Sequence, residues 1–328
     1  MNDQHLLEVK NLKTFFYNAS STIKAVDDIS FSVDQNMTLG VVGESGCGKS
    51  VTALSIMNLV PRGKGQVESG EIFYRTRGGD IVDILKMTWD GREMRRIRGN
   101  EISMIFQEPM TSLNPVITIG KQLMEVAKLH LDMNKKESEE KAREMLELVG
   151  ISNSAQQIHK YPHELSGGMR QRVMIAIALI CNPSFLIADE PTTALDVTIE
   201  AQILRLIRQL QEKLAMAVLI ITHDMGVIGE MADEVVVMYA GQIMEKADTQ
   251  RIFEAPLHPY TQGLLNSIPR IGRRKRLVPI TGSVPRLDKL PPGCPFGPRC
   301  PHSKAQCKQA PAFTEVEPNH FVRCWYYE

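Results

Sequence analysis

Short apolar runs alternate with longer amphipathic stretches along most of this chain. Residues 7–16 and 23–33 form two strand-like segments, the second with partial alternation of apolar and polar positions, and they predict an antiparallel layer. Residues 38–42, 185–188 and 217–222 are apolar almost throughout, which is typical of strands buried on both faces. Because such strands alternate with helical patterns, the sequence predicts a mainly parallel α/β sheet covered by helices on both faces.

The helical patterns lie between and after these strands, at 50–60, 135–149, 166–181 and 198–214. Residues 115–162 as a whole predict a helical insert. Within it, charges at i,i+4 spacing stand beside an apolar stripe that includes Ala142 and Val149. We interpret these charges as a solvated helix face.

Composition narrows the class of protein. The 328 residues are 43% hydrophobic and 23% charged, as in ordinary globular proteins, and the 38 Lys+Arg balance the 38 Asp+Glu, so we expect no nucleic-acid partner. The longest apolar run, at 173–181, is far shorter than the roughly 20 residues of a membrane span. The first residues lack the basic and apolar regions of a signal peptide, so we expect a cytoplasmic location.

A glycine-rich segment lies between a predicted buried strand and a predicted helix. Gly43, Gly48, Lys49 and Ser50 match the phosphate-loop pattern G-x-x-x-x-G-K-[ST]. The glycines let backbone N–H groups face phosphate oxygens, Lys49 neutralises the β and γ charges, and the Ser50 hydroxyl can bind Mg²⁺. The residues expected to contact nucleotide here are Gly43, Glu44, Ser45, Gly46, Cys47, Gly48, Lys49, Ser50 and Val51.

Two acidic residues follow the apolar strand at 185–188. Asp189 is placed to hold the magnesium shell and Glu190 to polarise the attacking water. Acidic residues also end many strands without any catalytic role, but the phosphate loop upstream favours the catalytic interpretation.

The segment LSGGMRQR, at 165–172, is a polar, glycine-rich entry to a helix. A helix N-terminus of this kind attracts an anion, here one supplied by a partner. Together with the two motifs above, the segment resembles the signature of the nucleotide-binding subunits of ABC transporters, and the resemblance extends over nearly the whole chain. It implies that Ser166, Gly167 and Gly168 of one subunit close over ATP held by a second ATPase subunit, either a paralogue or another copy.

The same resemblance assigns further residues. Gln107, within FQEP at 106–109, matches the glutamine that senses Mg²⁺ and the attacking water, and His223 matches the histidine that reaches the γ-phosphate. The expected catalytic residues are Glu190, His223, Gln107 and Lys49. The expected magnesium ligands are Ser50, Gln107 and Asp189.

Two more nucleotide contacts come from the resemblance. Asp196 ends a segment, TALD at 193–196, that matches the loop facing the second subunit. Phe16 matches the aromatic side chain that stacks on adenine, although Phe15 or Tyr17 could take this role and Phe16 could equally be a core residue.

The resemblance implies an α/β fold with a P-loop NTPase core of the ABC ATPase type, an antiparallel β subdomain, a helical subdomain and a small Cys-rich C-terminal extension. We expect the nucleotide-binding domain at 1–267, with the helical subdomain at about 95–165. From about 268, Pro, Gly, Arg and Cys dominate and periodicity ends, so we place the extension at 268–328.

Within the family, FQEPMTSLNP at 106–115 and LHPYT at 257–261 resemble the ATPases of dipeptide and oligopeptide importers, a subgroup that includes nickel and other small-solute systems. The implied partners are two transmembrane permease subunits and, indirectly, an extracytoplasmic peptide-binding protein. The implied location is the cytoplasmic face of the membrane. A soluble ABC ATPase of iron–sulfur assembly is an alternative that the cysteines keep open.

Four cysteines crowd the end of the chain: Cys294, Cys300, Cys307 and Cys324. Their spacing differs from the paired C-x2-C pattern of zinc ribbons, and four thiolates suit a [4Fe-4S] cluster with a structural role. Structural zinc and uncommitted thiols are the alternatives. We interpret the basic run at 270–276 as a solvated linker, with lipid headgroups or nucleic acid as less favoured contacts.

Overall fold

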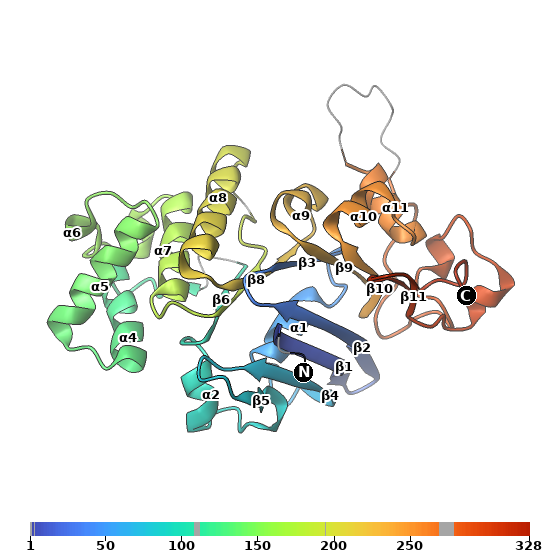
Figure 1. Ribbon diagram of the computed structural model, residues 1–328, viewed down its shortest axis with the longest axis horizontal. Helices are drawn as coiled ribbons and strands as arrows, with labels where there is room; N and C mark the ends of the chain where they lie inside the picture. Colours follow the sequence, from blue (N-terminus) through green and yellow to red (C-terminus); the bar gives the residue numbers. More distant parts are fainter. Residues whose placement is uncertain (1, 3, 108–111, 194, 269–278) are drawn as a thin grey trace.

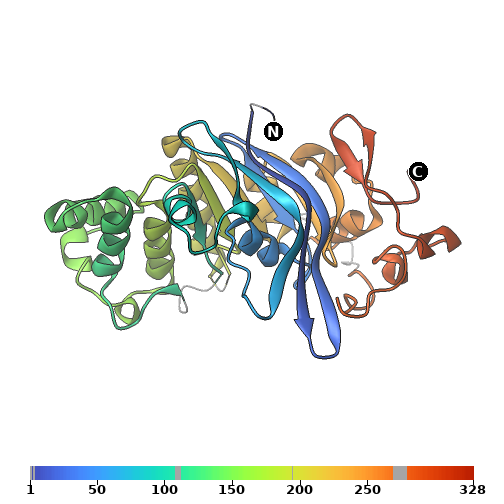
Figure 2. The ribbon, with the colours of Figure 1, turned by 90° about the horizontal axis from the view of Figure 1, so that it is seen from below.

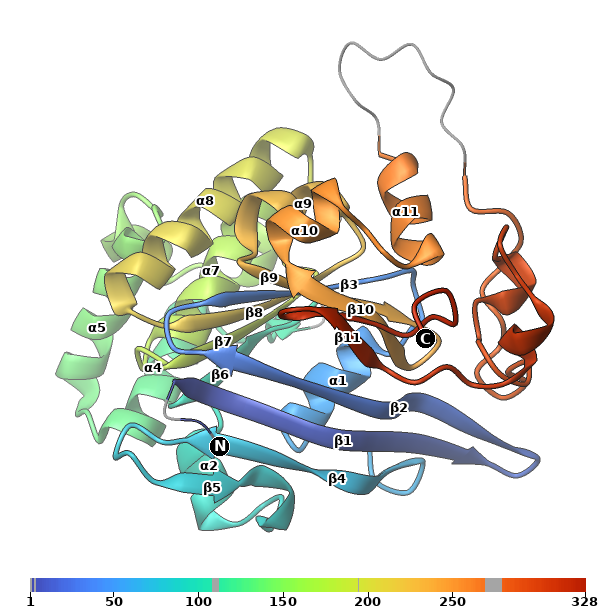
Figure 3. The same cartoon turned by 45° about the vertical axis from the view of Figure 1, so that its right-hand side comes forward.

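The computed structural model describes residues 2, 4–107, 112–193, 195–268 and 279–328 (Figure 1). Within them the strands form two sheets that lie face to face, with one helix between them (Figure 3). In the described part of the chain, no helix has both the length and the apolar character needed to cross a membrane.

The smaller sheet is antiparallel and confirms the layer predicted from residues 7–16 and 23–33. Its strand order is β2-β1-β4-β5. The strands are β1 (His5–Asn18), β2 (Ser21–Asp34), β4 (Gly65–Arg75) and β5 (Ile81–Asp83). The pairing of β1 with β2 contains register shifts, and these bulges increase the local twist of the long hairpin.

The larger sheet has the order β11-β12-β10-β9-β3-β8-β7-β6. Its parallel strands are β3 (Thr38–Val42), β6 (Ile102–Ile105), β7 (Phe185–Asp189), β8 (Ala217–Thr222) and β9 (Glu234–Tyr239). Three strands run antiparallel on one side: β10 (Gln242–Asp248), β11 (Thr314–Glu317) and β12 (His320–Val322). The three predicted apolar strands are all in this sheet.

The parallel strands are apolar because both of their faces are covered. In β7, Leu186 and Ala188 belong to one hydrophobic cluster, whereas Phe185 and Ile187 belong to the other. The prediction of helices on both faces is partly wrong. Helices cover one face, but α1 and the antiparallel sheet cover the other (Figure 3). The covering helices are α1 (Lys49–Ile56), α7 (Gly167–Leu179), α8 (Val197–Leu214), α9 (Met225–Met231), α10 (Thr249–Glu254) and α11 (Pro259–Asn266).

A helical part projects from one end of the molecule (Figures 1 and 2). It contains α4 (Ile119–Leu131), α5 (Lys135–Leu148), α6 (Ser154–Gln157) and a short 3₁₀ turn, η2 (Pro162–Glu164). The proposed range of about 95–165 begins too early, because it takes in β6, which pairs with β7 in the large sheet. Before it, the chain forms η1 (Ile84–Lys86) and α2 (Arg92–Ile97).

The end of the chain is joined to the core. β12 pairs with β10, so the tail extends the large sheet, and it carries two further 3₁₀ turns, η3 (Gly297–Arg299) and η4 (Ala305–Lys308). Phe296 and Cys294 are buried in the same hydrophobic cluster as the helices over the sheet. The proposed domain boundary at 268 borders residues 269–278, which are outside the described residues and include the whole basic run at 270–276.

Candidate functional site

The phosphate loop connects β3 to α1, as the sequence predicts. Gly48 has φ of 106°, a left-handed conformation that favours glycine, and a Cβ on Gly43 would lie 2.2 Å from the backbone oxygen of Met238. The loop therefore passes too close to the neighbouring backbone for a side chain at Gly43. Its amide groups lie at the N-terminus of α1, where the helix dipole favours phosphate.

The Lys49 side chain is buried and closes this loop. Its Nζ donates to the backbone oxygens of Gly43, at 2.7 Å, and Glu44, at 3.2 Å. The Nζ also lies 3.9 Å from Cys47 Sγ, and in the described residues none of these partners is a carboxylate, so the ammonium is held beside the amides of the loop. The arrangement provides a cation for the phosphates at the position that the motif predicts.

The loop meets the end of β7 through one short contact. The Ser50 hydroxyl donates to Asp189 Oδ1 over 3.1 Å. Burial raises the pKa of the Asp189 carboxyl, while the hydrogen bond from Ser50 opposes this shift. A hydroxyl and a carboxylate at this separation are the hard oxygen ligands that Mg²⁺ prefers, so the residues fit this cation.

Glu190 is held by three side chains from separate segments. Gln107 Nε2 donates to its Oε2 over 2.9 Å, and the Thr193 hydroxyl donates to the same oxygen over 2.9 Å. His223 Nδ1 lies 3.4 Å from Oε1. The backbone of Glu190 is also unusual, with φ of 47°, which costs about 1–3 kcal/mol in a residue with a side chain.

These contacts gather at one edge of the large sheet because its parallel strands end there. Glu190 follows β7, His223 follows β8, and Gln107 lies just beyond β6. Beside them is a cavity of about 550 Å³. Its lining residues are Ser50, Leu54, Met104, Phe106, Gln107, Ser112 and Asp189. Glu108 and Pro109, which complete the FQEP motif, lie outside the described residues.

The signature segment belongs to the opposite face of the sheet. Ser166 is exposed and caps α7, where its hydroxyl oxygen accepts the Met169 N–H at 3.3 Å. Helix α7 packs in one hydrophobic cluster and α1 in the other. A Cβ on Gly168 would lie 3.0 Å from Ile199, so this segment packs closely against α8.

Asp196 has a structural function in this chain. It caps α8, accepting from the Thr198 and Ile199 amides at 3.1 and 3.0 Å. Its side chain is exposed beside the signature segment. Ala194, which belongs to the same predicted loop, is outside the described residues.

The three aromatic residues that are candidates for stacking on adenine differ in what they contact. Phe16 packs over Gly65, where a Cβ would lie 2.7 Å from its ring. Phe15 is next to the Lys24 ammonium, 5.5 Å from its ring centroid, and Tyr17 donates to Glu68 over 2.6 Å.

The sequence argument missed two residues that touch the phosphate loop. The Tyr260 hydroxyl accepts the Glu44 N–H at 2.9 Å, and Arg299 pairs with the Glu44 carboxylate. The only sequence signal for Tyr260 was its place in LHPYT. For Arg299 there was none, because it is 255 positions from its partner.

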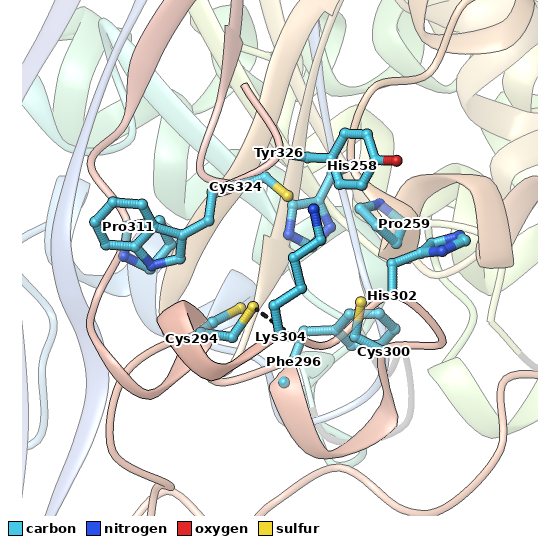
Figure 4. Close-up of a pocket in the computed structure, with 13 residues that line it drawn as sticks. His258, Pro259, Cys294, Phe296, Cys300, His302, Lys304, Pro311, Cys324 and Tyr326 are labelled. Atoms are coloured by element: carbon cyan, nitrogen blue, oxygen red, sulfur yellow. Dashed lines mark hydrogen bonds between the residues drawn. The ribbon is translucent and has the colours of Figure 1, made fainter. Parts of the chain in front are cut away.

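All four tail cysteines line one small cavity of about 20 Å³, where Cys294, Cys300 and Cys324 surround the Lys304 side chain (Figure 4). The backbone of Cys307 is hydrogen-bonded to that of Cys294, because the Cys307 oxygen accepts the Cys294 N–H at 2.9 Å. Burial raises the pKa of the Cys294 thiol to about 11. Among the described residues, no group of three or more His, Cys, Asp or Glu side chains is arranged to hold a metal ion.

Comparisons with known proteins agree with this geometry. The family model described as "ABC transporter" matches residues 26–193, and the one described as "Oligopeptide/dipeptide transporter, C-terminal region" matches residues 244–307. The oligopeptide transport ATP-binding protein AppD of Bacillus subtilis is 52% identical, with 98% of this chain and 97% of AppD covered. The dipeptide transport ATP-binding protein DppD of the same organism is 47% identical, with 98% and 95% covered.

The solved structures agree on the fold. A dimeric post-hydrolysis state of the ATP-binding cassette MJ0796, bound to ADP and Pi, has a TM-score of 0.65 and is 25% identical. The match covers 74% of this chain and 98% of that chain.

Proposed function

The chain belongs to the ABC transporter family, and from this premise we propose that it is the ATP-hydrolysing subunit of an importer of dipeptides or oligopeptides. The observation that carries the proposal is the gathering of Gln107, Glu190 and His223 beside the phosphate loop. The cargo class follows from relatives named as oligopeptide and dipeptide transport proteins. Nickel or another small solute is the alternative cargo.

The phosphate loop binds the triphosphate. The backbone amides of the loop and of the N-terminus of α1 donate to phosphate oxygens, and Lys49 exchanges its carbonyl partners for the β- and γ-phosphates. Ser50 and Asp189 would hold Mg²⁺, with Gln107 beside them. When bound, this cation neutralises charge that builds up on the phosphates.

Glu190 orients and polarises the attacking water. Three contacts fix its carboxylate, from Gln107, Thr193 and His223. Glu190 accepts a proton from the water as the water oxygen bonds to the γ-phosphorus and the bond to the β-phosphate oxygen breaks, and the products are ADP and inorganic phosphate. His223 is exposed, and we assign it to the γ-phosphate when ATP is bound.

Each nucleotide site is completed by a second ATPase subunit. Ser166, Gly167 and Gly168 present a helix N-terminus on the side of the sheet away from the chain's own loop, so they are placed to serve a partner. The MJ0796 cassette to which this chain is similar is dimeric. Asp196 would lie beside this interface, and Phe16 is assigned to adenine.

The ATPase works from the cytoplasmic face of the membrane, bound to two permease subunits. Phe106, next to Gln107, and Val116 are both exposed, and we assign these two side chains to the contact with the permeases. An extracytoplasmic binding protein would deliver the peptide. Opening and closing of the ATPase dimer would then move the permease helices.

Glu190→Gln tests the catalytic assignment. We expect ATP binding to persist while turnover falls by about 10²–10⁴-fold, because the amide cannot act as a base. The closed dimer should accumulate in this variant. Glu230→Gln, on the exposed end of α9, is the matched control and should keep wild-type turnover. Undiminished hydrolysis in Glu190→Gln would remove Glu190 from this role.

We also propose that Cys294, Cys300, Cys307 and Cys324 hold a [4Fe-4S] cluster that stabilises the tail. The support is that all four cysteines line one small cavity, which His258, His302 and Lys304 also line. The four side chains must move closer together to hold a cluster, since in the described residues no three of them are arranged to hold a metal ion. Lys304 crosses this space, so it must swing outward to make room. About four equivalents of iron with sulfide in anaerobically purified protein would support the cluster. One equivalent of zinc would replace it with the structural zinc alternative.

A soluble ATPase of iron–sulfur assembly remains the second candidate because of these four thiols. Affinity purification separates the two functions. An importer subunit copurifies with integral membrane subunits, whereas an assembly ATPase copurifies with soluble scaffold proteins.

A further inference from the structure

Glu44 is the second residue of the phosphate loop, yet its side chain is paired with the far end of the chain. Arg299 Nη1 donates to Glu44 Oε2 over 2.6 Å, and Nη2 donates to Oε1 over 3.0 Å. This two-point geometry is the strongest form of the arginine–carboxylate pair. The Arg299 side chain is only 5% exposed and that of Glu44 is 30% exposed, so the guanidinium is shielded from water while the carboxylate is partly open to it.

The Arg299 guanidinium is fixed by the tail itself. Its Nε donates to the Thr281 oxygen over 3.0 Å, and Nη1 also donates to the Tyr239 hydroxyl over 3.2 Å. Its backbone lies in η3, between Cys294 and Cys300, where the Arg299 N–H donates to the Phe296 oxygen. The tail therefore presents one positive charge to the loop in a fixed position.

A second contact joins the same loop residue to the core beneath the tail. The Glu44 N–H donates to the Tyr260 hydroxyl, so this amide faces away from the phosphates. Tyr260 packs against Tyr239 and Phe296, with ring centroids 4.7 and 5.3 Å apart. The loop is thus held from outside by a packed aromatic group and by an ion pair.

The negative charge of Glu44 lies in the loop that binds the triphosphate, so its pairing with Arg299 affects nucleotide binding. A carboxylate within a phosphate loop repels the anionic triphosphate unless a cation compensates it. Lys49 cannot serve both, because its ammonium is held by backbone oxygens of the loop and is needed at the phosphates. Arg299 is the cation that contacts the Glu44 carboxylate in the described residues.

We propose that Arg299 is a positioning residue of the nucleotide site: the tail completes the phosphate loop by neutralising and orienting Glu44. The inference rests on the proposed function, since it requires ATP to bind at this loop. It gives the tail a part in nucleotide affinity that is separate from the identity of any metal bound by its cysteines.

The test measures the dissociation constant of ATP for the full chain in four variants. Arg299→Gln leaves the carboxylate uncompensated and should weaken binding on the order of tenfold, while Arg299→Lys should recover part of the loss. The double variant Arg299→Gln with Glu44→Gln should return to within about threefold of wild type, because no net charge remains. Arg286→Gln is the control, since this exposed tail arginine pairs with Asp288.

Melting temperatures measured alongside separate this role from general support of the fold. Recovery of ATP affinity in the double variant supports the proposal. If Arg299 only supported the fold, removing the Glu44 charge as well would not restore ATP binding. Wild-type affinity in Arg299→Gln, or a double variant as weak as Arg299→Gln, would overturn it. If the wild-type protein bound no ATP, the proposed function itself would fail. If the wild-type protein bound ATP and Arg299→Gln bound it equally well, only this inference would fail, so the two outcomes are distinguishable.

Discussion

Glu245 is a fully buried carboxylate that joins three separate segments of the chain. Its Oε1 accepts the Leu257 N–H at 2.7 Å and contacts His320 Nε2 at 2.8 Å, and its Oε2 accepts the His258 N–H at 2.9 Å. One side chain on β10 thus fixes both the entry to α11 and strand β12 of the tail. We expect Glu245→Ala to destabilise the protein strongly.

The magnitude follows from the groups left behind. Each of the two amides that lose their acceptor costs about 1–3 kcal/mol when buried, and His320 loses its partner at the same time. Removing one partner of a buried pair typically costs about 3–5 kcal/mol. We adopt this range for Glu245→Ala, because water that enters the space left by the side chain satisfies some of the amides and His320 and lowers the total cost. An unfolding entropy of about 2.1 cal/mol/K per residue gives about 0.7 kcal/mol/K for the chain, so the melting temperature should fall by about 4–7 °C.

The assay is thermal unfolding followed by circular dichroism, with limited proteolysis to detect release of the tail. Glu234→Gln is the matched control, because Glu234 on β9 pairs with Lys246 on β10, next to Glu245 in sequence, but is partly exposed. This surface pair should be worth less than about 1 kcal/mol. If Glu245→Ala melted within about 1 °C of this control, the buried carboxylate would not be the anchor described here.

Two further predictions concern the loop and the helical part. Gly43→Ala should destabilise the protein more than Gly46→Ala, because a Cβ at Gly43 would lie 2.2 Å from a backbone oxygen. A Cβ at Gly46 would enter open space and meet only the strain of a left-handed backbone, about 1 kcal/mol. Melting curves of both variants check this order. Burial lowers the pKa of His130, so the stability it contributes is present above its unfolded pKa of about 6.5 and is lost as the pH falls below that value. His130→Gln should therefore lose less stability than wild type between about pH 6.5 and 5 in the same assay.

The nucleotide core was predictable because its signals are local. The phosphate loop, β7 and β8 are short continuous motifs, and parallel strands place their carboxyl ends at one edge, so the positions of Asp189 and Glu190 beside the loop could be predicted from the sequence. The hydrogen bond from Thr193 to Glu190 was not predicted, since nothing in the spacing distinguishes it from other hydroxyls in the segment.

The strands of the tail were not predicted, because they depend on contacts with distant residues. β11 and β12 are too short for any periodicity to identify them, and β12 exists as a strand because β10 offers it an edge. The composition change near 268 suggested a separate unit. It reflects the loss of local periodicity, whereas Cys294 and Phe296 remain part of the main hydrophobic cluster.

These contacts also explain why a polar, cysteine-rich segment can be fixed in one place. Apolar burial alone allows several positions, whereas a buried carboxylate with hydrogen-bonding partners is satisfied in a single geometry and is costly to leave unpaired. Glu245 with His320 fixes the tail near its end, and Glu44 with Arg299 fixes it near its middle. Because Glu44 belongs to the phosphate loop, the second contact couples the position of the tail to the charge of the nucleotide site. Moving Arg299 away would leave the Glu44 carboxylate uncompensated beside the phosphates.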